Sequence, residues 1–150
     1  MSELSFRFAG EADVPAIVAL LADDDIAGHR EEGTVPAEYA KAFAAMSAMP
    51  TNRLLLAERD GEILGVLQLV FIPGLTRRGA TRAHIEGVRV KSTARAHGIG
   101  TELMCRAIEE AKRAGCTLVQ LTSDKRRARA HLFYRRLGFQ QTHEGFKRLL

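Results

Sequence analysis

A chain of 150 residues, 46% hydrophobic and 27% charged, has enough apolar side chains to bury one core. No apolar run reaches the roughly 20 residues that span a bilayer, which argues against a membrane-spanning protein. The first residues lack the basic and apolar pattern of a signal peptide, which argues against an exported protein and favours a cytoplasmic one. Residues 1–62 carry 5 Lys/Arg against 12 Asp/Glu and residues 63–150 carry 17 against 6, which predicts that the second part meets an anion.

The first fifty residues predict one short strand and two helices. Leu4–Phe8 alternates apolar and polar side chains, as a strand does. From Glu11 the apolar residues recur at helical spacing. Residues 23–35 are polar and contain two glycines, so they are expected to form a loop or a broken helix. Pro36 opens a second helical pattern, which ends before Pro50.

Three strands are expected next, and the third contains an irregularity. Arg53–Glu58 and Glu62–Ile72 flank an Asp-Gly pair, which is a strong signal for a hairpin turn. Thr81–Val90 resumes the alternation of a strand, but its phase breaks at Glu86-Gly87. A glycine inside a strand often marks a β-bulge, so a bulge is predicted there.

The remaining residues predict a strand–helix–strand crossover and a final strand. A helix is expected at Thr101–Ala114, a strand at Thr117–Thr122 and a helix at Asp124–Leu137. Phe139–Leu150 is expected to return as one strand or a hairpin. A crossover of this kind implies parallel strands, and such sheets bind ligands where their strands end.

A glycine-containing segment lies between the third of these strands and the following helix. Two glycines there let the backbone approach a phosphate, and the first N–H groups of the helix can donate to its oxygens. A tight turn without function is the alternative. No Gly-Lys-Ser/Thr follows, which excludes a P-loop, and no third glycine has the spacing of a dinucleotide site. The segment consists of Arg95, Ala96, His97, Gly98, Ile99, Gly100 and Thr101.

Arg95 to Gly100 resembles the Q/R-x-x-G-x-G/A acyl-CoA signature of the GNAT N-acyltransferase superfamily. Ala130–Phe139 (AHLFYRRLGF) resembles the second signature of that superfamily, a helix ending in F-Y-x-x-x-G-F. The resemblance implies one α+β domain over residues 1–150, with three layers. It also implies a mixed, mostly antiparallel sheet of six to seven strands, with a central splayed parallel pair and about four flanking helices.

The same resemblance implies the activity, which is transfer of an acetyl group from acetyl-CoA to a primary amine of a small molecule or peptide by direct attack in a ternary complex. The pyrophosphate of the donor would lie on the backbone N–H groups from Arg95 to Thr101. Its pantetheine arm would bond the backbone of Val88 and Val90. Two departures from the family pattern stand nearby. Ala96 replaces a frequent glycine, and Arg127 replaces a common asparagine and is a candidate to reach a phosphate instead.

Two side chains are candidates for catalysis. Tyr134 matches the family tyrosine that protonates the departing thiolate, and a phenol of pKa ~10 can transfer a proton to a thiolate of pKa ~8.5. The alternative is a tyrosine packed in the core. Glu86 occupies the strand before the glycine segment, where several family members place a carboxylate that deprotonates the incoming ammonium through water. The alternative is an outward-facing carboxylate paired with an arginine.

The acceptor is the least defined part of the prediction. In the family the first helices and the turn after the third strand form the acceptor pocket. Here those regions carry an acidic run at Asp23–Asp25, Glu31 and Glu32, and arginines at Arg77, Arg78 and Arg82. A small amine is expected because the acceptors of the family are often small amines, and acylation of an oxygen stays open. A homodimer is a separate expectation.

Two other functions stay open for the basic second part of the chain, residues 63–150. Lys125–Arg129 with Arg135-Arg136 is the densest basic patch, and a solvated helix face that partly serves the cofactor 3′-phosphate is favoured over nucleic acid. A domain that binds acyl-CoA as a regulatory ligand without turnover is the other alternative. No His or Cys pair has metal-ligand spacing, so no metal is expected.

Overall fold

The computed structural model describes residues 2–24 and 36–150, so most of the loop predicted at residues 23–35 lies outside the described residues. The elements follow the predicted order, with three-residue helical turns at Glu11–Asp13 and Ser92–Ala94. They are β1 (Ser5–Phe8), α1 (Val14–Ala22), α2 (Pro36–Ser47), β2 (Asn52–Arg59), β3 (Glu62–Ile72), α3 (Thr76–Gly79), β4 (Arg82–Val90), α4 (Ile99–Arg113), β5 (Leu118–Leu121) and α5 (Ala128–Arg136).

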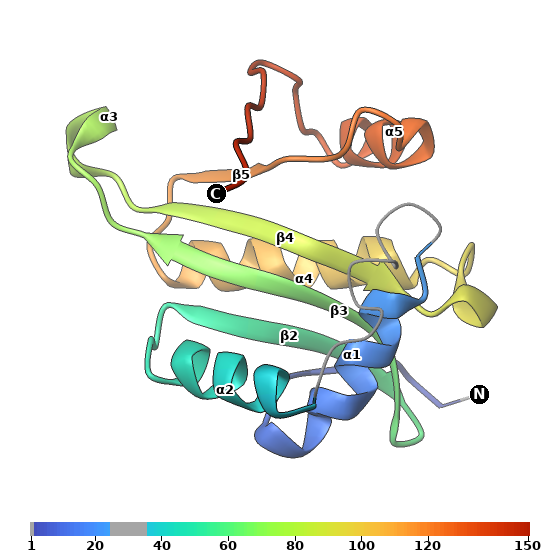
Figure 1. The fold of residues 1–150 in the computed structure, drawn as a ribbon. Coiled ribbons are helices and arrows are strands. Elements are labelled where there is room, and N and C mark those ends of the chain that lie inside the picture. Colours follow the sequence, from blue (N-terminus) through green and yellow to red (C-terminus); the bar gives the residue numbers. More distant parts are fainter. Residues whose placement is uncertain (1, 25–35) are drawn as a thin grey trace.

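The strands form one sheet in the order β1-β2-β3-β4-β5 (Figure 1). Neighbouring strands are antiparallel except β4 and β5, which are parallel and joined by the crossover through α4. The β2–β3 hairpin turns at Asp60 (φ 53°) and Gly61 (φ 77°), the two positive φ values that a tight hairpin turn requires. The predicted hairpin and crossover are confirmed.

Helices cover both faces of the sheet, so the predicted α+β, three-layer architecture is confirmed. On one face, Ile17 and Leu20 of α1 pack against Leu56 and Val66. On the other face, α4 inserts fully buried side chains such as Leu103 into the larger part of the core. Side chains of α5 pack against this second cluster as well. The apolar stripe of α4 and the alternation in β2–β4 dictate these two faces.

The predicted bulge is present in β4. Gln68 pairs with Glu86 and Val66 with Arg89, so two residues of β4 stand opposite the single residue between them in β3. One of the two is Gly87, at φ 62°. The extra residue shifts the phase of the strand. Glu86 is exposed after the buried Ile85, while the residues beyond the bulge return to the α4 side.

The parallel pair separates at the functional end of the sheet. Pairing between β4 and β5 ends at Ile85 and Leu121, whereas β4 continues to Val90. From Glu86 to Val90, β4 therefore keeps β3 on one side but has no neighbouring strand among the described residues on the side that faces β5. This splay was expected, but its position was not: β5 is the last strand, so the parallel pair lies at the edge of the sheet rather than at its centre.

Two details of the prediction are wrong, and one short helix was not expected. The described sheet has five strands rather than six to seven, because residues 140–150 form no strand; their first residues, QQTHE, offer no apolar alternation to bury. Helix α5 begins at Ala128 rather than at Asp124, because the Asp124 carboxylate accepts the Arg126 N–H at 2.9 Å and holds a turn. The short α3 brings the helices to five and was not expected.

Candidate functional site

The glycine segment forms a turn that leads directly into α4. Gly98 is the N-terminal cap residue of the helix, with φ 78°. The first bond of the helix runs from the Glu102 N–H to the Gly98 carbonyl at 3.1 Å. Among the described residues, the N–H groups of Ile99, Gly100 and Thr101 have no hydrogen-bond partner. Such free donors at the positive end of a helix dipole suit the oxygens of a phosphate.

The two glycines of the segment have different roles. A Cβ added at Gly98 would meet no atom within 4 Å, so this glycine serves the left-handed turn and leaves its outer side open. A Cβ added at Gly100 would lie 3.5 Å from Phe133 Cζ and 3.6 Å from Val90 Cγ2. These are ordinary van der Waals distances, so Gly100 lies against α5 and β4 without the packing alone requiring a glycine there. Ala96 adopts φ 65°, a conformation that favours glycine, at the position where the family often has one.

The Arg95 side chain connects the glycine segment to the end of β4 and to the residue that follows α1. Its Nε donates to the Val90 carbonyl at 3.0 Å, and its Nη2 donates to the Asp23 carbonyl at 2.8 Å. Asp23 in turn accepts the Ser92 N–H at 2.9 Å, and this hydrogen bond holds the pKa of its carboxyl below the usual value. The Arg95 guanidinium thus holds the end of α1 against the end of β4.

The splayed edge of β4 exposes the backbone positions expected to bond the donor arm. The Val88 carbonyl accepts a hydrogen bond from Arg89 Nη1 at 2.8 Å, and the Val90 carbonyl accepts the one from Arg95. Side chains rather than a sixth strand therefore satisfy these carbonyls. Each carbonyl oxygen has two lone pairs, so both can still accept a second bond from an extended ligand.

An ion cluster that the sequence did not predict lies beside this edge. Asp24 accepts from Arg127 at 2.7 Å and 3.1 Å, and Arg89 lies 3.0 Å from the same carboxylate. Only 7% of the Asp24 side chain is exposed. Arg127, expected to reach a phosphate, is thus engaged with α1. Of the residues in this cluster, only Arg89 could have been noticed in the sequence, because it is a charged residue between two valines of a strand.

Tyr134 lies on α5 next to this cluster. Its ring packs against Phe133 and Phe139, with ring centroids 5.3 Å and 6.0 Å away. Its hydroxyl makes no hydrogen bond to residues 2–24 or 36–150. Burial raises the pKa of Tyr134 above its usual value, while the positive charges of Arg89 and Arg127 act in the opposite direction. The residue is a protonated phenol whose hydroxyl has no partner within the described residues.

Glu86 belongs to a polar strip on the face of the sheet opposite α4. Arg82, His84 and Glu86 alternate with the buried Ala83 and Ile85. The Glu86 carboxylate is exposed and has no ion-pair partner in the described parts of the chain, so the arginine pairing considered for it does not occur there.

Neighbouring strands extend this strip. Gln68, opposite Glu86 on β3, donates to Asn52 at 2.8 Å. On β5, Gln120 Nε2 lies 3.5 Å from His84 Nδ1. On this face α1 packs against β3 and β4, and α2 packs against β2, with the polar side chains of β4 and β5 beside them.

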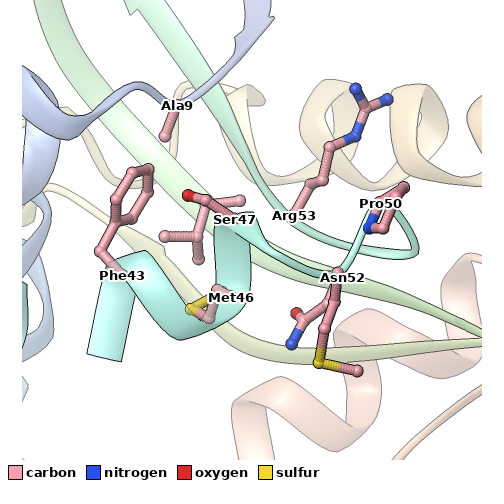
Figure 2. A pocket seen from close by; sticks show the side chains of 9 residues that line it. Ala9, Phe43, Met46, Ser47, Pro50, Asn52 and Arg53 are labelled. Carbon is pink, nitrogen blue, oxygen red and sulfur yellow. The ribbon is translucent and has the colours of Figure 1, made fainter. Parts of the chain in front are cut away.

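A pocket of about 170 Å³ opens between α2 and β2 on the same face. Figure 2 shows Phe43 and Met46 of α2 lining it, with Ala9 and Asn52 among the residues opposite. Its volume is below the roughly 300 Å³ at which ligand sites begin. Asn52 connects the pocket to the polar strip through Gln68. The pocket thus adjoins the polar strip, and none of the predicted site residues lines it.

The other sequence candidates contribute less. His97 is exposed in the glycine segment. Of the basic patch, Arg126 pairs with Asp124 and Arg127 with Asp24, so carboxylates interrupt its positive charge. Within residues 2–24 and 36–150, no cluster of three His, Cys, Asp or Glu side chains has the arrangement of a metal site. No helix in the described part of the chain is long and apolar enough to cross a membrane.

Comparisons with known proteins bear on this site. The family described as "Acetyltransferase (GNAT) family" matches residues 15–139. The aminoalkylphosphonate N-acetyltransferase of Salmonella typhimurium is 33% identical over 112 residues, which cover 75% of this chain and 72% of that protein. The glucosamine 6-phosphate N-acetyltransferase of Trypanosoma brucei brucei is 36% identical over 98 residues, 65% of this chain and 64% of that protein. A solved structure described as a transcriptional regulator from Bacillus halodurans C-125 is 45% identical, with a TM-score of 0.95, and covers 99% of this chain and 100% of that chain.

Proposed function

This chain belongs to the GNAT acetyltransferase family, and from its site we propose how it performs the acetyl transfer from acetyl-CoA to an amine. Acetyl-CoA supplies an activated thioester. The free N–H groups of Ile99, Gly100 and Thr101 suit its pyrophosphate, and Gly98 leaves open space on the same turn. The splayed edge at Val88 and Val90 suits its pantetheine amides.

We assign the two proton transfers to Glu86 and Tyr134. The exposed Glu86 carboxylate, at the bulge where β4 and β5 part, takes a proton from the acceptor ammonium through water. The amine nitrogen then forms a bond to the acetyl carbon, the carbon–sulfur bond breaks, and Tyr134 donates its proton to the departing sulfur. The nitrogen loses its surplus proton to water as the amide forms, and water returns a proton to Tyr134. The protonated hydroxyl of Tyr134, which no residue in the described part of the chain engages, is the observation that carries this assignment. Proton transfer of this kind contributes about 10²- to 10⁴-fold in rate.

We propose that the acceptor is a small primary amine that carries a phosphate or phosphonate group. The named substrates of two relatives combine an amine with such a group. In this chain Arg82 lies on the same face of β4 as Glu86 and makes no ion pair with the described residues. The exposed Arg77 and Arg78, on the adjoining turn, are likewise unpaired there. Arginine is the side chain best suited to a phosphate or phosphonate dianion.

An acceptor comparison tests this proposal. Thiol release from acetyl-CoA is measured with 2-aminoethylphosphonate and with ethanolamine, which has the same amine but no phosphonate. We expect the phosphonate to raise kcat/KM, and Arg82→Gln to remove that preference through KM. Arg129→Gln, an exposed α5 arginine away from this face, is the control and should not change it. Equal kcat/KM for both amines would contradict the proposed acceptor class while leaving the transfer itself intact.

The relative from Bacillus halodurans, described as a transcriptional regulator, favours one second candidate, a domain that binds acyl-CoA as a regulatory ligand. Turnover separates the two. An enzyme releases thiol with an amine acceptor and loses this activity in Tyr134→Phe, whereas a ligand-binding regulator binds acetyl-CoA without release. The interrupted basic patch gives little support to direct binding of nucleic acid.

Four broader assignments are proposals too. We propose that residues 1–150 act as a single acetyltransferase domain in the cytoplasm without a metal. We also propose that the protein forms a homodimer, for which the exposed residues 140–150 give support.

A further inference from the structure

One carboxylate and two guanidinium groups meet beside the opening between β4 and β5. Asp24 Oδ2 lies 2.7 Å from Arg127 Nη2 and 3.0 Å from Arg89 Nη2. The Asp24, Arg127 and Arg89 side chains are only 7%, 23% and 17% exposed, so water screens their charges weakly. Two positive charges against one negative leave the cluster with one net positive charge.

The location of Asp24 is unfavourable for a carboxylate on local grounds. It follows the C-terminal end of α1, which is the negative end of the helix dipole, and it is almost fully buried. A buried ion cluster is often no more stabilising than apolar side chains of the same size. Stability alone therefore does not account for these charges at this place.

The bulge in β4 determines where the Arg89 guanidinium lies. Beyond the bulge Arg89 stands opposite Val66, whose side chain packs with α1, so Arg89 is on the α1 face of the sheet. Its Nη1 donates to the Val88 carbonyl at 2.8 Å, and its Nη2 lies against Asp24. Asp24 thus holds this guanidinium at the part of β4 that has lost β5 as a neighbour.

Arg127 and Tyr134 lie on one face of α5. Arg127 is the N-terminal cap residue, and Tyr134 follows it by seven residues, about two helical turns. Long helical side chains lean toward the N-terminus of their helix, so the Tyr134 phenol is directed toward the end where Arg127 lies. Burial raises the pKa of Tyr134, and the charges of Arg89 and Arg127 oppose that effect. His131, between the two on the helix, is engaged with the Asp124 carbonyl, 2.9 Å from its Nε2.

We propose that Asp24 is a positioning residue for the acetyl transfer. It holds the Arg89 and Arg127 guanidinium groups where their charge stabilises the tyrosinate that forms when Tyr134 protonates the departing sulfur. This role rests on the proposed function, in which Tyr134 is the proton donor.

The charge that moves in this step matches the charge of the cluster. As the Tyr134 O–H bond breaks and the S–H bond forms, one negative charge passes from the sulfur to the phenol oxygen, and water later returns the proton. A negative charge on a partly buried phenol is costly unless fixed positive groups face it. Without Asp24 the two guanidinium groups would repel each other and turn toward solvent on their long side chains.

A double-mutant cycle between Asp24 and Tyr134 tests this role, because it separates an effect exerted through the tyrosine from a general loss of structure. Thiol release from acetyl-CoA is measured with the native chain, Asp24→Ala, Tyr134→Phe and the double variant, with 2-aminoethylphosphonate as the acceptor. We expect Asp24→Ala to lower kcat about threefold to tenfold, a part of the contribution of the proton donor, with little change in KM. It should have no further effect once Tyr134 is Phe.

The titration of Tyr134 gives a second readout that needs no acceptor. The chain has two tyrosines, so in a Tyr39→Phe background the ultraviolet absorbance of tyrosinate reports Tyr134 alone. Because Arg89 and Arg127 lower the pKa of Tyr134, their displacement in Asp24→Ala should raise it, by about one unit. Loss of the Asp24 charge with both arginines in place would instead lower this pKa, and unfolding would bring it to the ordinary value of about 10.

Asp13→Ala is the matched control. Asp13 forms a two-point pair with Arg7 at 2.7 Å and 2.8 Å and is 14% exposed, so it resembles Asp24 in bonding and burial. It lies in the turn before α1, at the opposite end of that helix from Asp24. Both variants should lose stability, but only Asp24→Ala should change kcat and the pKa of Tyr134. Circular dichroism under the assay conditions checks that each variant is folded.

Two results would overturn the proposal alone. One is a loss of kcat in Asp24→Ala that is equally large with and without the Tyr134 hydroxyl, since Asp24 would then act only on the fold. The other is a pKa of Tyr134 that falls or stays unchanged in folded Asp24→Ala. Native kcat in Tyr134→Phe is a different result, because it overturns the proton-donor role of Tyr134 in the proposed function and this proposal with it.

Discussion

Asp24 and Arg127, 103 residues apart in the chain, form a two-point ion pair with distances of 2.7 Å and 3.1 Å. Arg89 of β4 lies 3.0 Å from the same carboxylate. The cluster therefore joins the end of α1 to β4 and to the start of α5, which surround the opening between the parallel strands. It also places two positive charges near the Tyr134 hydroxyl.

Asp24→Asn is expected to lower the free energy of unfolding by about 2 to 3 kcal/mol. Removing one member of a buried ion pair leaves the other charges uncompensated, at a cost of about 3–5 kcal/mol when burial is complete. The cost is smaller here because Arg127 and Arg89 are 23% and 17% exposed. Urea denaturation measures the change. Glu109→Gln is the control, since its pair with Arg113 spans 3.9 Å at the surface and should contribute under about 0.5 kcal/mol. Equal effects of the two variants would contradict the assigned role of Asp24.

Tyr134→Phe is expected to lower kcat by about 10²-fold or more, because the departing thiolate loses its proton donor. The free energy of unfolding should stay within about 0.5 kcal/mol of the native value, since the hydroxyl has no partner in the described residues and the ring contacts are kept. Thiol release at saturating substrates and urea denaturation give the two numbers. A variant with native kcat would show that another group, or water, protonates the thiolate.

The alkaline limb of kcat tests the same tyrosine in a second way. A general acid works in its protonated form, and burial raises the pKa of Tyr134. The rate should therefore be maintained up to the ordinary phenol value of about 10 and fall only above it. Arg127→Gln removes a positive charge that lowers this pKa, so it should move the limb to still higher pH. The measurement is kcat against pH at saturating donor. A limb attributable to Tyr134 below pH 9, or a downward shift in Arg127→Gln, would contradict this role.

Ala96→Gly is expected to stabilise the fold by about 1 kcal/mol. Ala96 has φ 65°, and a left-handed conformation costs a residue with a Cβ about 1–2 kcal/mol. Ala94→Gly, in the neighbouring helical turn at Ser92–Ala94, should have the opposite sign and cost about 0.5–1 kcal/mol. Thermal or urea denaturation compares them. If both variants destabilise the protein, the strain assigned to Ala96 is absent.

The sequence predicted those parts of the site that depend on local backbone. Gly87 and Gly98 occupy positive φ, and each marks a feature expected from its position: the bulge that exposes Glu86 and the turn that starts α4. The helical and strand periodicities likewise located the core faces. Such features follow from a few neighbouring residues, so a single sequence contains their signal.

The features that were missed depend on distant parts of the chain. The acidic run appeared as a possible attraction for an amine, whereas Asp24 is paired with two arginines remote in sequence. Periodicity carries no information on that pairing. The strand expected at Phe139–Leu150 did not form: these residues pair with no described strand, although the outer edge of β5 is open, and periodicity cannot predict whether such a pairing occurs.

A calorimetric titration of acetyl-CoA tests the central claim most directly, namely that the turn before α4 holds the donor. The native chain is compared with Gly98→Asp, which places a carboxylate beside the proposed pyrophosphate site. Gly61→Asp is the matched control, since Gly61 has φ 77° against 78° for Gly98 and neither has an atom within 4 Å of an added Cβ. We predict binding by the native chain and by Gly61→Asp, with affinity at least about tenfold weaker in Gly98→Asp, a change of about 1.4 kcal/mol. No binding by the folded native chain, or equal affinity in both variants, would contradict the assigned donor site.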